Sequence, residues 1–129
     1  MFGIHKSDTS SVQPWEYVPA AVGEYKTGQM LNMAGGNATA LSAASTSTPP
    51  YLCMADKEIT EAGNPLPVIR VTPGQIFETT LSAAAATAAI GGKLQVSAGG
   101  MEASPGAGSF EIVGLDGKEV GDAVRGRFA

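Results

Sequence analysis

Two residues of the chain belong to the types that most often act as nucleophiles or metal ligands, a single cysteine, Cys53, and a single histidine, His5. A cysteine nucleophile needs a neighbouring base to form its thiolate, and Cys53 stands between two apolar residues with no such base nearby in sequence. A structural zinc site needs about four His or Cys donors. We therefore expect a buried, unreactive Cys53, a His5 that is solvated or contacts a partner, and no metal site.

Acidic residues gather in two short runs, at residues 56–61 and 116–122, each with a lysine inside it. Neither run has the alternating aspartate order of a calcium-binding EF-hand loop, so solvated loop charge explains both. The glycines form no Gly-x-Gly-x-x-Gly loop between a strand and a helix, no phosphate loop followed by lysine and no Gly-x-Ser-x-Gly turn. These patterns indicate a protein that is not an enzyme and that needs no cofactor.

The overall charge argues against nucleic acid as a partner. The chain has 129 residues and a formal net charge of -4, with no run of basic residues, whereas phosphate binding needs clustered Lys and Arg. One cysteine excludes an internal disulfide framework and fits folding in a reducing cytoplasm. The N-terminus lacks the apolar run of a signal peptide, and the Ala-rich residues 83–90 are too few to span a bilayer. We therefore expect no contact with a membrane.

The highest concentration of strand-forming residues lies at residues 66–81, where two β-branched and aromatic runs flank Pro73 and Gly74. Such residues suit a pleated, half-buried surface, and Pro-Gly is a strong turn dipeptide. The pattern predicts a strand, a turn and a second strand, which together form the central pair of the fold. Arg70 and Glu78 would then lie close enough across the turn to interact.

Shorter strands complete a single domain predicted for residues 20–129. Ser82 could cap a short helix over residues 83–90, because Ala has the highest helix propensity, but a loop fits nearly as well. The sequence therefore predicts a mainly β fold, a small β-barrel or β-sandwich of the β-tulip type with at most one short helix. The remaining predicted strands are residues 28–33, 51–55, 93–97, 110–115 and 124–128.

Residues 1–19 have a different character, being polar, irregular and interrupted by Pro14. We expect an extended N-terminal arm, because the segment holds too little apolar content to pack on itself. Trp15 and Tyr17 can each bury a large area with few torsions to freeze, so these two residues, with Val12 and Val18, are the candidate contacts to a partner. The alternative is a terminus whose aromatic side chains fold back on their own domain.

Most of the chain from about residue 20 onward resembles the decoration, or capsid-stabilising, proteins of tailed bacteriophages and prophages, of the lambda-like decoration family. The resemblance is carried by five runs of sequence. They are YLCMADK at 51–57, LPVIRV at 66–71 continuing to FET at 77–79, and FEIVGLDG at 110–117 continuing to GDAVRGRF at 121–128.

The resemblance implies a structural, non-enzymatic β-rich protein on the outer surface of a phage head. Its partner would be the major capsid protein, and the protein would often be a trimer that locks neighbouring capsid subunits after expansion. An N-terminal arm pairs with capsid strands in lambda-like relatives, and residues 1–19 occupy the matching place. The resemblance thus places the protein on the virion, after folding in the host cytoplasm.

A second function class also fits the residues. A stand-alone β-barrel module for adhesion or glycan binding would display exposed aromatic residues beside amide and acidic groups. The candidates for such a site are Tyr25, Tyr51 and the aromatic residues of the arm.

Overall fold

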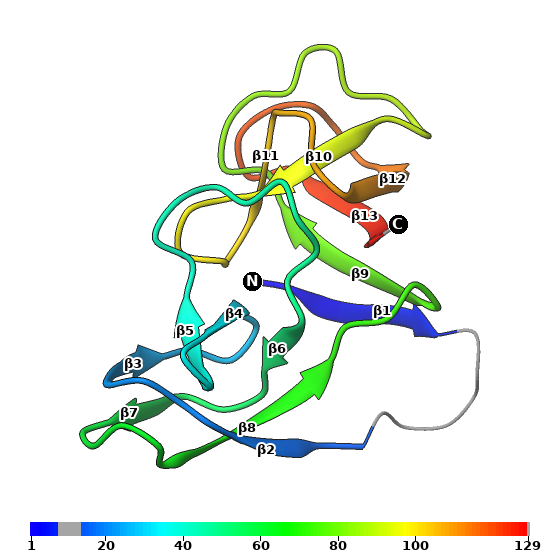
Figure 1. Cartoon of the computed structure of the whole chain (residues 1–129). Coiled ribbons are helices and arrows are strands. Elements are labelled where there is room, and N and C mark those ends of the chain that lie inside the picture. Colours follow the sequence, from blue (N-terminus) through cyan, green and yellow to red (C-terminus); the bar gives the residue numbers. More distant parts are fainter. Residues whose placement is uncertain (8–13, 129) are drawn as a thin grey trace.

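The computed structural model describes residues 1–7 and 14–128, and within these residues the protein is built from strands and loops alone. Thirteen strands form three antiparallel sheets, none of which closes into a barrel. The predicted mainly β fold is therefore confirmed, with a small sandwich-like arrangement in place of the barrel (Figure 1). No helix in the described part of the chain could cross a membrane.

The largest sheet has six strands and carries the C-terminal half of the chain. Its inner face bears the aromatic residues Phe77, Phe110 and Phe128, all less than 2% exposed. Charged side chains occupy its outer face, where Arg127 contacts Glu111 and Arg125 contacts Asp116. In spatial order the strands are β1 (Gly3–Ser7), β9 (Gln75–Thr80), β13 (Ala123–Phe128), β12 (Phe110–Leu115), β10 (Lys93–Val96) and β11 (Ala103–Ser104).

A five-stranded sheet and a two-stranded ribbon hold the strands between residues 16 and 70. The five-stranded sheet curls, so that a single bridge between Ala20 and Ala38 joins the ends of its two edge strands without closing it. Its spatial order is β2 (Glu16–Pro19), β8 (Pro65–Arg70), β6 (Tyr51–Cys53), β4 (Met30–Ala34) and β5 (Asn37–Ala40), and the ribbon pairs β3 (Gly23–Tyr25) with β7 (Lys57–Ile59).

Strand β8, inside the five-stranded sheet, is buried on both faces, which explains its unbroken apolar run. Ile69 belongs to a core shared with the six-stranded sheet, while Leu66 and Val68 belong to a second core that includes residues of the ribbon. A strand buried on one face alternates apolar and polar residues, but a strand buried on both faces is apolar throughout. The five-stranded sheet therefore contributes to two cores, one shared with the six-stranded sheet and one shared with the ribbon, and Figure 1 shows the six-stranded sheet above the other two.

Strands β8 and β9 were predicted as a pair, and this prediction is wrong. Both strands exist close to the predicted bounds, but β8 pairs with β2 and β6 whereas β9 pairs with β1 and β13. The turn between them directs the chain from one sheet to the other. Gln75 stabilises this corner, because its side chain accepts a hydrogen bond from Thr72 N (2.8 Å) and donates one to Arg70 O (3.1 Å).

The N-terminal segment does not stand apart from the domain. Residues Gly3–Ser7 pair with β9 and residues Glu16–Pro19 pair with β8, so the described parts of residues 1–19 are sheet strands rather than a separate arm. The physical reason is that Phe2 is 1% exposed and packs edge-on against Phe110 with ring centroids 5.7 Å apart. One buried aromatic side chain supplies the apolar area that the segment otherwise lacks.

Residues 83–90 form a loop, the second of the two alternatives predicted for them. Their amides bond to neighbouring segments instead of forming a continuous helical ladder: Ala85 N donates to Lys118 O (2.8 Å) and Gly91 N donates to Ile112 O (2.9 Å). Tertiary contacts thus override the helix propensity of alanine.

Candidate interaction surface on strand β2

The sequence-predicted contact residues fall into three groups in the structure. Trp15 and Tyr17 are exposed, at 50% and 67% of their surface, whereas Val18 is buried in the second core. Val12 lies outside the described residues. The structure therefore places Tyr17 on strand β2 (Glu16–Pro19), Trp15 directly before it, and Val18 in the interior.

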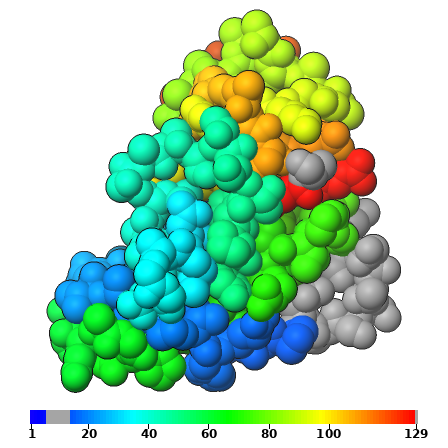
Figure 2. All heavy atoms as spheres, viewed as in Figure 1, coloured from blue at the N-terminus to red at the C-terminus, as the bar shows by residue number. Residues whose placement is uncertain are grey.

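The two aromatic residues lie at the start of an edge strand. Within the five-stranded sheet β2 has β8 as its neighbour, with Tyr17 opposite Pro67 and Glu16 opposite Val68. Alternate side chains of a strand point to opposite faces, so Tyr17 lies on one face of β2 and Glu16 and Val18 lie on the other, while Trp15 directly precedes the strand. Figure 2 shows this segment, in blue, at the surface along the lower border of the molecule.

A charged clamp fixes β2 in place behind the aromatic pair. Arg70 Nη2 lies 3.0 Å from Glu16 Oε1 and Arg70 Nε lies 3.2 Å from Glu16 Oε2, the two-point geometry that suits a guanidinium and a carboxylate. The same guanidinium lies over the ring of Tyr51, 5.2 Å from its centroid, and donates to its hydroxyl at 3.2 Å. The hydrogen bond that Arg70 donates to Glu16 raises the pKa of Arg70 above its ordinary value, with Tyr51 acting in the same direction.

This clamp replaces the predicted contact between Arg70 and Glu78. Arg70 lies at the end of β8 in one sheet and Glu78 lies in β9 of another, where its Oε2 is 3.4 Å from His5 Nδ1. The Arg70 and Glu16 side chains are both partly exposed to solvent, so their ion pair adds little to the free energy of unfolding. Its main effect is to hold β2 in one orientation.

Two other aromatic residues considered as surface groups are buried. Tyr25 is 3% exposed, its hydroxyl donates to Ala21 O at 2.7 Å, and burial raises the pKa of its phenol. Tyr51 is 9% exposed beneath Arg70. Trp15 and Tyr17 are therefore the exposed members of the predicted aromatic set.

The reactive side chains are positioned as structural groups. Cys53 is buried as predicted, its thiol donates to Ala55 O at 3.1 Å, and burial raises the pKa of the thiol, which disfavours the reactive thiolate. His5 lies on the outer face of β1 beside Glu78. Among residues 1–7 and 14–128, no group of three or more His, Cys, Asp or Glu side chains is arranged to hold a metal ion.

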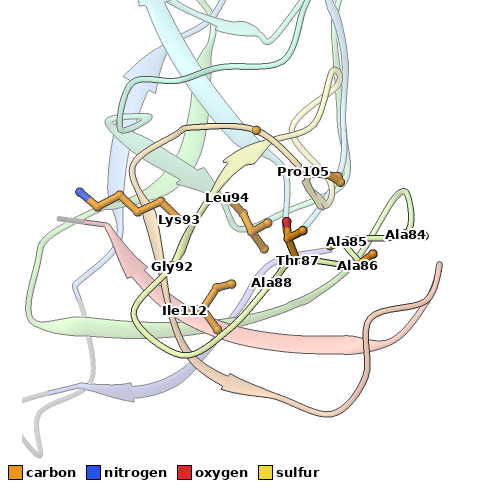
Figure 3. A pocket seen from close by; sticks show the side chains of 11 residues that line it. Ala84, Ala85, Ala86, Thr87, Ala88, Gly92, Lys93, Leu94, Pro105 and Ile112 are labelled. Atoms are coloured by element: carbon orange, nitrogen blue, oxygen red, sulfur yellow. The ribbon is translucent and has the colours of Figure 1, made fainter.

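A shallow hollow of about 300 Å³ lies at the opposite end of the molecule, between the loop at residues 83–90 and strand β10. Figure 3 shows Leu94 and Ile112 at its floor, while the Lys93 side chain extends away from it. The polar side chains of the lining are the hydroxyl of Thr87 and the ammonium of Lys93, and the remaining lining is apolar side chains and backbone.

Sequence reasoning singled out Trp15 and Tyr17, which are exposed in the structure, but it did not identify the residues that hold β2. Glu16 and Arg70 are 54 positions apart in the chain, and their contact depends on the register between β2 and β8. The one signal in the sequence was the carboxylate of Glu16, which stands between Trp15 and Tyr17. No family model and no curated protein sequence matches this chain, so the surface is interpreted from its own geometry.

Proposed function

We propose that the protein is a structural virion protein that decorates the outer surface of a phage head and stabilises the expanded capsid. The observation that carries this proposal is the exposed pair Trp15 and Tyr17, directly before and within an edge strand that the contact between Glu16 and Arg70 ties to β8. Exposed Trp and Tyr residues on a rigid strand have the properties of binding hot spots. The sequence resemblance supplies the class of partner, the major capsid protein.

The proposed contact has two components. The side chains of Trp15 and Tyr17 fill pockets on a capsid subunit, and a capsid strand adds to the free side of β2. Strand addition supplies backbone hydrogen bonds, while alternate side chains supply specificity. The bridge between Ala20 and Ala38 occupies the end of β2, so residues 16–18 are the part that offers an edge.

The proposed contact surface is a strand of the folded domain and not a free arm. Because β2 is already paired with β8, binding needs little ordering of the segment, and the entropy cost of binding is lower. Self-association, as a trimer around a local threefold axis of the head, belongs to the same proposal. A shell repeats each contact many times, so modest individual contacts together resist internal pressure.

The test of this function is co-sedimentation of the purified protein with the unexpanded and expanded capsids of the virus or prophage whose genome encodes it. The proposal predicts saturable binding to expanded capsids. Absence of binding to both forms, together with binding of the same protein to a glycan array, would favour the adhesion or glycan-binding alternative. Deletion of residues 1–19 is unsuitable as a test, because it removes two sheet strands and the buried Phe2.

A further inference from the structure

Strand β1 departs from an otherwise simple division of the chain. Strands β2 to β8, from residues 16–70, build the five-stranded sheet and the ribbon, and strands β9 to β13, from residues 75–128, build the six-stranded sheet. Among the described strands, β1 alone crosses this division, because it comes from the N-terminus and yet lies beside β9 (Figure 1). It is an added strand on a sheet that the rest of the chain builds without it.

The position that β1 occupies is shaped like a binding groove for an extended peptide. The backbone of Gly3–Ser7 pairs with β9 along one side. At its end, Phe2 enters the core between Phe110 and Phe128, with ring centroids 5.7 and 6.3 Å away. The main chain is also recognised, because Phe2 N donates to Gly28 O at 2.9 Å.

Position 28, which lies against this peptide, suits glycine alone. Its φ of +85° lies in the left-handed region that favours glycine, and a side chain there would strike Met1 and the carbonyl of Phe2. The loop that carries Gly28 therefore acts as the wall of the groove. It closely approaches Met1 and Phe2, the two residues that precede β1.

Strand β1 lies at the edge of its sheet, whereas its neighbour β9 is paired on both sides. It has one strand neighbour, β9, and a bulge between Ile4 and Lys6 interrupts the ladder. Ile4 and His5 are both exposed, so among residues 1–5 Phe2 is the one buried side chain. An edge strand held by one anchor can open without breaking any other strand pair.

We propose that β1 is an exchangeable strand, and that the groove along β9 is a binding site for residues 1–7 of a second copy of this chain. The occupant is argued from the structure itself, since this segment is seen in the groove. An identical segment from another copy would make the same contacts, so exchange leaves their free energy unchanged. The chain's own segment is covalently attached and therefore has a high effective concentration at the groove. A segment from a second copy competes with it only at high protein concentration, so exchange depends on protein concentration.

The site takes peptides of one class, an extended strand preceded by a buried aromatic side chain at the second residue. It differs from the proposed capsid-binding surface, which lies on β2. The two proposals can therefore fail separately. A chain that binds capsids without exchanging β1, or exchanges β1 without binding capsids, would distinguish them.

Hydrogen exchange on the unmodified chain tests whether β1 opens independently. The backbone amides of the β1 and β9 ladder should exchange at least about 10-fold faster than those of the β12 and β13 ladder, because they open in a smaller unit. Equal exchange rates in the two ladders would overturn the proposal, since β1 would then leave only on global unfolding. Because this measurement uses the unmodified chain, it does not depend on whether any variant folds.

Peptide binding tests the groove directly. A labelled peptide of residues 1–7 is titrated, by fluorescence anisotropy, into the full chain and into its Phe2→Ala variant, whose own segment no longer competes. The variant should bind the peptide at least about 10-fold more tightly than the natural chain does. A Phe2→Ala peptide should lose binding, whereas an Ile4→Ala peptide, altered at an exposed side chain, should bind nearly unchanged. Equal binding of the natural and Phe2→Ala peptides, or no binding to either chain, would contradict the proposal.

Discussion

Glu16 and Arg70, 54 residues apart, meet in a two-point hydrogen bond of 3.0 and 3.2 Å that ties the edge strand β2 to β8. This contact lies directly behind the two exposed aromatic residues. It connects the fold to the proposed function, because it sets the direction in which Trp15 and Tyr17 face a partner.

Removing this clamp should loosen β2 with little effect on the rest of the fold. In Arg70→Gln, the amides of β2 should exchange about 10-fold faster, because one strand edge loses a fixed contact. The thermal midpoint should change little, since solvated ion pairs add little stability. Hydrogen exchange with calorimetry makes the comparison, and Arg127→Gln, which removes an exposed ion pair far from β2, is the control. Unchanged exchange in β2 would show that the clamp does not order the strand.

The aromatic core should dominate the stability of the six-stranded sheet. Phe110 is fully buried and contacts the rings of Phe2 and Phe128. Phe110→Ala should therefore lower the free energy of unfolding by about 3–5 kcal/mol. Val113→Ala, on the same strand but 36% exposed, should cost about 0.5 kcal/mol or less. Urea unfolding measures both, and similar losses in the two variants would contradict the assigned core.

Two adjacent glycines allow the cost of backbone strain to be measured separately from the cost of a steric clash. Gly99 and Gly100 have φ values of +87° and +78°, but a Cβ at Gly100 would overlap the carbonyl of Met30, whereas a Cβ at Gly99 meets open space. Gly99→Ala should cost about 1–2 kcal/mol from strain alone. Gly100→Ala should cost clearly more, and it also threatens the hydrogen bond from Met30 N to Gly100 O (2.7 Å). Equal losses in urea unfolding would show that the Met30 contact is absent.

Acid should weaken the loop between β12 and β13 through Asp116. The hydrogen bond from Arg125, at 2.8 Å, holds the pKa of Asp116 below its ordinary value of 3.8. Because the folded pKa is the lower one, the stabilisation is complete above pH 3.8 and is lost as pH falls through the folded value. Asp116→Asn should therefore be less sensitive than the natural chain to pH below 3.8.

The control for the acid experiment is Glu61→Gln, which alters an exposed loop carboxylate. Urea unfolding between pH 2.5 and about 6 records the free energy of each chain. The control should keep the acid sensitivity of the natural chain. An identical pH profile for Asp116→Asn would show that the contact with Arg125 adds nothing.

The sequence predicted the positions of single strands better than it predicted which strands pair with one another. The strand at residues 110–115 has the predicted bounds, because its residue types favour strand structure and acidic and glycine residues follow it. Cys53 is buried as its apolar neighbours indicated. These properties depend on residues close together in the chain, and local patterns therefore carry them.

Pairing between sheets depends on contacts that local patterns do not encode. The β8 and β9 runs looked like a hairpin, but each strand has apolar residues to bury in its own sheet, and a corner stabilised by Gln75 separates them. Phe2 gave no periodic signal, being a lone aromatic residue beside Met1 and Gly3, yet it anchors β1. The clamp between Glu16 and Arg70 was unpredictable for the same reason, because it depends on which strands become neighbours.

The most direct test of the proposed function is the affinity of the double variant Trp15→Ser, Tyr17→Ser for expanded capsids. Ile90→Ser is the matched control, because Ile90 is 66% exposed, as Tyr17 is at 67%, and lies in the loop at the opposite end of the molecule. The double variant should bind at least about 100-fold more weakly, the loss expected for two hot-spot residues, while the control binds as the natural chain does. Unchanged binding of a folded double variant would contradict the role assigned to the β2 surface.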